Sequence, residues 1–209
     1  MDTAIKIRIL NANQVEEIQT ATQQGQPLLV VSSTSQYQWI YNDAGSGSNM
    51  DGSVFRPTPT DADVFIIGDM AQAGYGDPKG TSLTVKAVND SGTRPLLKAP
   101  VGYAKVWDDS GSGGDNDGAI WHPVAPDGYI AIGAVASTGY NAPDIANYRC
   151  LRSDLVEITS FGTLIWHDQG SGAHGDVELY TLQGVGGAFL AEPSYNTPGG
   201  TYYKLKTTF

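Results

Sequence analysis

Short apolar runs recur along the whole chain, and glycine, proline, asparagine, aspartate or serine separates them. Several runs alternate with period two and are rich in β-branched and aromatic residues, which is typical of strands. Residues 5–9 alternate in this way and predict a strand. Residues 12–24 are the one segment compatible with a helix, although a loop or a strand also fits their pattern. The pattern therefore predicts an all-β chain of many short strands.

The predicted strands fall into three similar sets. Each set begins with a short apolar strand (28–31, 96–98 and 155–158), continues through a second apolar run (64–68, 129–133 and, more loosely, 188–190) and ends with an alternating strand (83–88, 148–151 and 202–206). We therefore predict a single domain over residues 1–209. It consists of three repeats at about 27–91, 95–153 and 154–209, preceded by an N-terminal strand segment.

A glycine-rich motif occupies the same place in each repeat. It reads Tyr41-Asn42-Asp43-Ala44-Gly45-Ser46-Gly47, then Trp107-Asp108-Asp109-Ser110-Gly111-Ser112-Gly113, then Trp166-His167-Asp168-Gln169-Gly170-Ser171-Gly172. A second aspartate follows each copy at a constant spacing (Asp51, Asp117 and Asp176), and an aromatic residue follows that (Phe55, Trp121 and Tyr180). A sequence motif that recurs at fixed spacing indicates that the fold is built from three similar structural units.

Three β units of this size cannot each bury a hydrophobic face alone. Three antiparallel sheets packed around a pseudo-threefold axis solve this problem, and they form a β-prism. A β-trefoil is the main alternative, but its repeats are usually shorter, and a propeller needs more blades. We therefore predict a β-prism with pseudo-threefold symmetry.

The acidic balance of the chain narrows the classes of partner. The net charge is -10, from 12 Lys and Arg against 22 Asp and Glu. Phosphate binding needs clustered basic residues, so nucleic acid is not an expected partner. Purely electrostatic attraction to anionic lipid is disfavoured for the same reason. Neutral partners or bound cations suit this charge better.

Cysteine usage and the apolar pattern bear on the compartment. Cys150 is the one cysteine, so an intrachain disulfide is excluded and a reducing compartment is the simpler expectation. The N-terminus lacks the apolar run of a secretory signal, and no stretch approaches the roughly 18 apolar residues of a membrane span. We expect a cytoplasmic protein or one secreted without a leader.

The repeated loop combines carboxylates, exposed backbone and a flanking aromatic ring. Aspartate accepts paired sugar hydroxyls, glycine amides donate, and an aromatic ring stacks on the C–H face of a sugar. Three copies would make binding multivalent. The candidate ligand-binding residues are Asp43, Gly45, Ser46, Gly47 and Asp51 in the first repeat; Asp109, Gly111, Ser112, Gly113 and Asp117 in the second; and Asp168, Gly170, Ser171, Gly172 and Asp176 in the third.

Calcium is a compatible cofactor, although none is required. Asp115-Asn116-Asp117-Gly118 resembles the start of an oxygen-rich calcium loop, so Asp109, Asp115 and Asp117 are candidate metal ligands. The other two loops lack this density of oxygen ligands, and the distal Glu of a complete calcium loop is absent.

The same residues also have a structural interpretation. A repeated Asp in a turn often caps backbone N–H groups, a Gly-Ser-Gly turn is often a bulge or hairpin, and a repeated Trp is often core. The aromatic residues that open the motif (Tyr41, Trp107 and Trp166) are expected to pack inside. Fully buried aspartates that cap backbone would favour this interpretation over ligand binding.

An enzyme is not expected. Asp109-Ser110-Gly111 superficially resembles a protease nucleophile turn, but no His and Asp complete a credible triad. His167, His174 and Asp168 match no standard metal spacing, and Cys150 is expected to be a small buried residue.

The chain resembles the Vps62 family, also called DUF946, of plants and fungi. The segments that carry the resemblance are residues 106–113, 119–123, 126–133 and 149–156 in the second repeat and residues 55–57 and 65–69 in the first. It covers roughly residues 27–160. The third repeat departs from it, because Thr181-Leu182 replaces the proline pair and Val185-Gly186-Gly187 replaces the Gly-Tyr strand. The resemblance implies a β-prism-like fold, and related modules occur at the C-termini of pore-forming, perforin-like toxins.

Three functions follow from these observations. The first is a non-enzymatic, lectin-like module that binds a glycan or a glycosylated surface at its repeated loops. The second is a membrane-recognition or toxin-accessory domain that binds lipid head groups or a pore-forming partner. The third is a scaffold without a ligand. If the first holds, Asp109→Ala should weaken ligand binding and leave the far-UV spectrum unchanged.

Overall fold

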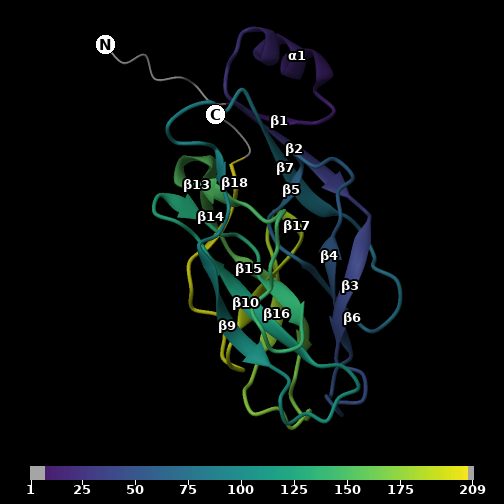
Figure 1. The fold of residues 1–209 in the computed structure, drawn as a ribbon. Coiled ribbons are helices and arrows are strands. Elements are labelled where there is room, and N and C mark those ends of the chain that lie inside the picture. Colours follow the sequence, from purple (N-terminus) through teal and green to yellow (C-terminus); the bar gives the residue numbers. More distant parts are fainter. Residues whose placement is uncertain (1–7, 207–209) are drawn as a thin grey trace.

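The computed structural model describes residues 8–206, and the regular secondary structure within them is almost entirely β-strand (Figure 1). Strand β1 (Arg8–Asn11) is the described part of the predicted N-terminal strand, while residues 5–7 lie outside the described residues. The α-helix α1 (Val15–Gln23) falls inside the segment whose pattern allowed a helix. Ala21 is its buried residue, so the helix is attached to the rest of the fold by a small contact.

The three repeats share one order of strands, except that the third repeat has one strand fewer. Residues 27–91 hold β2 (Leu28–Thr34), β3 (Tyr37–Asn42), β4 (Gly52–Pro57), β5 (Phe65–Ile66), β6 (Met70–Ala73) and β7 (Ser82–Val88). Residues 95–153 hold β8 (Leu97–Lys98), β9 (Gly102–Asp108), β10 (Gly118–Val124), β11 (Tyr129–Ile130), β12 (Val135–Thr138) and β13 (Cys150–Arg152). After the 3-10 helix η1 (Ser153–Leu155) come β14 (Val156–Thr159), β15 (Phe161–His167), β16 (Glu178–Leu182), β17 (Val185–Glu192) and β18 (Tyr202–Leu205).

Each repeat contributes one three-stranded antiparallel sheet. Their strand orders are β3-β4-β6, β9-β10-β12 and β15-β16-β17, so the second strand of each hairpin is central. The opening aromatic of the motif occupies the same register in all three, since Tyr41 pairs with Val54, Trp107 with Ile120 and Trp166 with Leu179. These separate sheets form the predicted pseudo-threefold β-prism, whereas a trefoil requires a barrel.

A second set of sheets lies nearer the N-terminal helix (Figure 1). Their orders are β1-β2-β7-β5, β8-β13-β11 and β14-β18, with β1 parallel to β2 and the other pairs antiparallel. The third of these sheets lacks a counterpart of β5 and β11. The corresponding residues belong to β17, which pairs with β16 instead. The loosely patterned run at 188–190 is thus part of one longer strand.

The main chains of the three repeats come into close contact at Gly68, Gly133 and Ala188. A Cβ added to Gly68 would lie 2.9 Å from Gly133 Cα and 3.0 Å from Ala188 Cβ. Side chains larger than hydrogen cannot fit at the first two positions, because the main chains themselves are in contact there. The backbone N–H of Asp69 donates to Ala134 O (3.0 Å), and that of Ala134 donates to Phe189 O (2.9 Å). These bonds join equivalent positions of successive repeats.

The opening aromatic residues of the three motifs meet inside the three-stranded sheets. Tyr41, Trp107 and Trp166 are 2–3% exposed, and their rings pack edge to face with centroid separations of 6.0, 6.5 and 5.6 Å. Edge-to-face pairs at this separation add to the stabilisation from burial alone. The prediction that these three residues pack inside is confirmed.

Candidate functional site

The three Gly-Ser-Gly loops lie together at the end of the molecule opposite α1 (Figure 1). A backbone N–H of each loop donates to a carbonyl of the next: Asn49 to Gln169 (2.8 Å), Asp115 to Ala44 (2.7 Å) and His174 to Ser110 (2.9 Å). The donors occupy equivalent positions in the motif, and so do the acceptors. The three loops therefore form a closed ring of hydrogen bonds, and their relative positions are determined by the fold.

The first aspartate of each motif is buried beneath this ring. Asp43, Asp109 and Asp168 are 2–3% exposed, and one carboxylate oxygen of each accepts a backbone N–H from the far side of its own loop. The donors are Gly52 (2.8 Å), Gly118 (3.1 Å) and Val177 (2.9 Å). A buried carboxylate that accepts backbone N–H groups closes the loop much as a cap closes a helix.

Two of these carboxylates also receive an indole N–H from another repeat. Trp166 Nε1 donates to Asp43 Oδ2 (2.9 Å), and Trp107 Nε1 donates to Asp168 Oδ2 (2.9 Å). The residue equivalent to these two tryptophans in the first repeat is Tyr41, and its ring lies near Asp109. Burial, and then the charge of Asp109, raise the pKa of the Tyr41 phenol, so it is protonated at neutral pH. Asp109 accordingly lacks the indole bond that its two counterparts accept.

This burial changes the interpretation of Asp43, Asp109 and Asp168. Their carboxylates are enclosed and bonded to protein groups, and direct contact with a large ligand would require the loops to open. The structure therefore favours the structural interpretation for these three residues. Asp109→Ala is correspondingly a test of folding as much as of binding, because removing the carboxylate leaves buried donors unpaired.

The glycine and serine residues of the loops have different roles. Ser46, Ser112 and Ser171 accept the backbone N–H two residues ahead (3.2, 3.1 and 3.1 Å) and stabilise the turn. The six glycines are exposed, and all have φ between 69° and 95°, a region that other residues rarely adopt. They are Gly45, Gly47, Gly111, Gly113, Gly170 and Gly172. The exposed backbone of the loops is thus provided by glycine.

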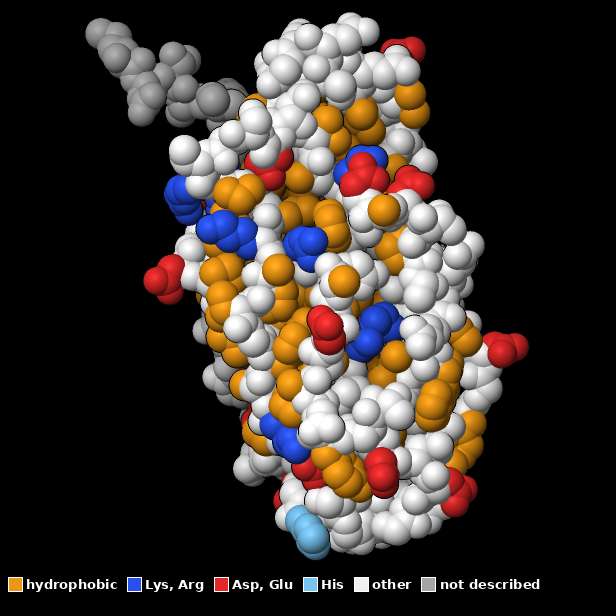
Figure 2. All heavy atoms as spheres, in the orientation of Figure 1, with side chains coloured by type: hydrophobic (Ala, Val, Ile, Leu, Met, Phe, Trp, Pro, Cys, Tyr) orange, Lys and Arg blue, Asp and Glu red, His pale blue; other side chains and the backbone are white. Residues whose placement is uncertain are grey.

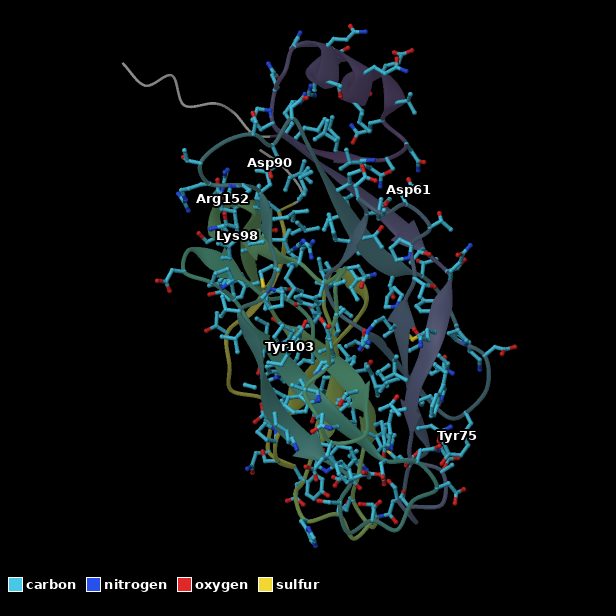
Figure 3. The ribbon with its side chains drawn as sticks, viewed as in Figure 1. Asp61, Tyr75, Asp90, Lys98, Tyr103 and Arg152 are labelled. Carbon is cyan, nitrogen blue, oxygen red and sulfur yellow. The ribbon has the colours of Figure 1, made fainter. Side chains whose placement is uncertain are left out.

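The second aspartate of each motif remains accessible and lies beside a tyrosine. Asp51, Asp117 and Asp176 are exposed, and the neighbouring Tyr75, Tyr140 and Tyr195 are 44%, 38% and 39% exposed. The Tyr140 hydroxyl donates to Asp117 (2.9 Å), while those of Tyr75 and Tyr195 donate to the buried Asp43 (3.0 Å) and Asp168 (2.8 Å). Tyr75 lies toward the loop end in Figure 3, and several acidic side chains lie near that end on the face shown in Figure 2.

Each tyrosine hydroxyl interacts with both aspartates of its own repeat. The pKa of Tyr75 and Tyr195 is raised first by burial of the hydroxyl and then by the two aspartates. The pKa of Tyr140 is raised first by its hydrogen bond to Asp117, then by burial and by Asp109. The result is three equivalent surface sites, each with an accessible carboxylate, a tyrosine ring and glycine backbone.

The sequence pattern did not reveal these tyrosines, because their distance from the motif differs between repeats. A local signal does exist. Each follows a small residue and precedes glycine or asparagine, in Gly74-Tyr75-Gly76, Gly139-Tyr140-Asn141 and Ser194-Tyr195-Asn196. These short turns place the rings beside the loops.

The predicted metal ligands are not brought together. Among residues 8–206, no group of three His, Cys, Asp or Glu side chains is placed to share a metal ion. Asp109 faces into its own loop, whereas the N–H of Asp115 bonds to Ala44 and its carboxylate lies beside Gly45 of the neighbouring repeat. The ring of loop contacts thus separates Asp115 from Asp109. Asp109, Asp115 and Asp117 are therefore not arranged to coordinate one metal ion.

Cys150 is fully buried, and burial raises the pKa of its thiol to about 12. The thiol is therefore protonated at neutral pH, and its position in the core agrees with the prediction of a small buried residue.

None of the described helices is long and apolar enough to cross a membrane.

Comparison with solved structures finds the crystal structure of GNIP1Aa from Chromobacterium piscinae, with a TM-score of 0.71 and 31% sequence identity. The match covers 85% of this chain but 37% of GNIP1Aa, so this chain corresponds to a minor part of that protein. No curated protein matches the chain. The family described as vacuolar protein sorting-associated protein 62 matches residues 19–192, in agreement with the triple motif and the β-prism, and the chain belongs to this Vps62 family.

Proposed function

We propose that the protein is a non-enzymatic, multivalent carbohydrate-binding module whose three sites lie at the loop end. The observation that supports this proposal is the threefold recurrence of an exposed tyrosine beside an exposed aspartate: Tyr75 with Asp51, Tyr140 with Asp117 and Tyr195 with Asp176. Burial of the first aspartates moves the binding role from Asp43, Asp109 and Asp168 to these neighbours.

The chemistry of each site suits a neutral, hydroxyl-rich ligand. A tyrosine ring offers a flat surface for the C–H face of a sugar, and a carboxylate accepts hydroxyl donors in charge-assisted hydrogen bonds. Exposed glycine amides and carbonyls are within the same loops. One such shallow site binds weakly, but three sites on a rigid end can engage one glycosylated surface together, which increases avidity.

The proposal is tested with a glycan array on three proteins. The wild type is expected to bind a defined set of glycans. The triple variant Tyr75→Ala/Tyr140→Ala/Tyr195→Ala is expected to lose that signal, because truncation of a stacking ring removes the main apolar contact at every site. Trp39→Ala is the matched control, since Trp39 is 40% exposed on β3 but is not one of the three tyrosines.

Two further arms separate the alternatives. The array is repeated in EDTA, and a signal that disappears there would assign calcium a bridging role. A triple variant that binds as well as the wild type would contradict the assignment of the sites. If the wild type binds no glycan, carbohydrate recognition is wrong, and binding to liposomes then tests the membrane-recognition alternative.

A further inference from the structure

A cleft of about 350 Å³ separates the second and third repeats, away from the Gly-Ser-Gly loops. Strand β10, residues 131–134 and the end of β17 form its walls, and residues 200–202 close one side. Its lining includes His122, Ile132, Ala134, Leu190, Glu192 and Tyr202. We call it the repeat 2–3 cleft.

An ion pair lies at the equivalent place between the first and second repeats. Arg56 donates through Nε and Nη2 to the two carboxylate oxygens of Asp69 (3.0 and 2.9 Å), and through Nη2 to Ala136 O (2.6 Å). Asp69 is fully buried. The guanidinium thus has a carboxylate and a carbonyl as acceptors in a protein-lined site.

At the repeat 2–3 cleft both members of this pair are replaced by smaller groups. His122 takes the place of Arg56, since each stands between an aromatic residue and a proline. His122 Nε2 lies 3.0 Å from Ala191 O, and Arg56 Nη2 donates to the equivalent Ala136 O at 2.6 Å. Ala134 takes the place of Asp69, because their N–H groups make equivalent bonds to the next repeat. The cleft therefore lies beside the positions that correspond to the ion pair of the first junction.

A tyrosine that contributes to the first junction also lies differently at the second. Tyr148 is fully buried and its hydroxyl donates to Gly133 O (3.1 Å). Its counterpart Tyr202 packs edge to face on Phe161, with a centroid separation of 6.3 Å, and its hydroxyl accepts the N–H of Gly200 (2.9 Å). Tyr202 consequently forms a wall of the cleft, and its hydroxyl is bound to the loop at the rim.

The cleft retains a negative charge without a partner from the protein. Glu192 lines it, and on the sheet Glu192 pairs directly with Glu178. Like charges at directly opposed positions repel each other. The Glu178 carboxylate accepts the hydroxyl of Tyr180, but neither glutamate takes part in an ion pair within residues 8–206. The lining contains no Lys or Arg.

We propose that the repeat 2–3 cleft binds a small guanidinium compound, in which an external guanidinium takes the part that Arg56 plays at the first junction and Glu192 supplies the carboxylate. A planar guanidinium donates two parallel hydrogen bonds to a carboxylate, which a point-like ammonium cannot do. Ile132, Leu190 and Pro193 provide an apolar wall for an alkyl stem attached to it. This site is independent of carbohydrate binding at the loops.

The test is an NMR titration of the full chain with n-butylguanidinium, which carries the charged group on a short alkyl stem. Saturable shifts are expected for the amides of residues 131–134 and 190–193, with a Kd of about 1 mM, a reasonable scale for a ligand this small. n-Butylammonium should bind several-fold more weakly, and n-butanol should produce no saturable shift at these residues. Equal binding of all three compounds would overturn the assignment of a guanidinium site.

Two variants examine the site itself. Glu192→Gln preserves size and removes the charge, so it should weaken n-butylguanidinium binding about tenfold, while Asp127→Asn on an exposed loop should leave it unchanged. The double variant His122→Arg/Ala134→Asp rebuilds the ion pair of the first junction inside the cleft and should abolish binding. If that variant fails to fold, Glu192→Gln alone decides. Unchanged affinity in Glu192→Gln, or the absence of saturable binding in the wild type, contradicts the proposal.

Glycan binding by Glu192→Gln is measured on the same array as the wild type. It should be unaffected, so failure at the cleft and failure at the loops are distinguishable outcomes.

Discussion

At the scale of single residues, Asp168 connects its own loop with two other parts of the fold. It accepts the N–H of Val177 in its own loop, the indole N–H of Trp107 from the second repeat and the hydroxyl of Tyr195. Hydrogen bonds to a charged group contribute more than neutral ones, and their loss leaves buried donors unpaired. Asp109 is the matched comparison, because Tyr41 replaces the indole donor there.

We predict that Asp168→Ala lowers the free energy of unfolding by about 3 kcal/mol and Asp109→Ala by roughly half as much. Chemical denaturation of both variants, with the far-UV spectrum as a check of native structure, measures the difference. Equal losses would show that the indole bond adds little. A larger loss in Asp109→Ala would contradict this account of the ring of loops.

The two aspartates of each motif could not be told apart from the sequence. Both recur at constant spacing beside glycine, so both fit a ligand-binding and a capping role equally well. The two aspartates differ in burial, because only the first faces the inside of the prism. Its orientation depends on contacts between repeats, such as that of Trp166 with Asp43. By contrast, the inward position of Tyr41, Trp107 and Trp166 was predictable, since a large aromatic residue recurring at one strand position is a core signal.

At the scale of elements, strands with a strong alternating pattern were predicted well, and weakly patterned segments were not. The alternating run at 83–88 corresponds closely to β7 (Ser82–Val88). In the third repeat, the Gly186-Gly187 pair weakens the pattern, and the run at 188–190 is part of β17 (Val185–Glu192), which pairs with β16. The choice of partner depends on which neighbouring strand is free, and a single sequence does not encode that choice locally.

Helix α1 is only weakly supported by packing. It is nine residues long, Ala21 is its buried residue, and Gln14 at its N-terminus makes no side-chain capping bond to it. Isolated helices of this length are marginal in water, so most of their stability must come from tertiary contact. Strand β10, by contrast, is central in its sheet and mostly buried.

We therefore predict that the amides of α1 exchange with solvent at least about 100-fold faster than those of β10, through local opening without global unfolding. Hydrogen–deuterium exchange followed by NMR or mass spectrometry measures both elements in one experiment. Protection of α1 equal to that of β10 would mean that the helix unfolds only with the whole domain, contrary to its small buried contact.

At the scale of the whole molecule, charge and burial act together on the dependence of stability on pH. The chain carries a net charge of -10, and self-repulsion of this kind destabilises the compact state. Burial raises the pKa of Asp109 and Asp168 despite their hydrogen bonds. A carboxyl whose pKa is higher in the folded state contributes stability below its unfolded pKa and loses it as the pH rises through the folded value.

Lowering the pH reduces the negative charge of the chain and also favours the protonated forms of the two buried aspartates, and both effects stabilise the fold. We therefore predict that the thermal midpoint rises by a few degrees when the pH is lowered from 7 to about 5. The pKa of Asp154 is lowered, first by its hydrogen bond to Arg152, and such groups lose their contribution only as the pH falls further, below about 4. Differential scanning calorimetry across this range gives the profile. Asp168→Asn, which cannot titrate at this position, should show a smaller rise. A midpoint that falls steadily from pH 7 to 5 would indicate that the buried aspartates are stabilised in their charged form, and that their hydrogen bonds outweigh the cost of burial.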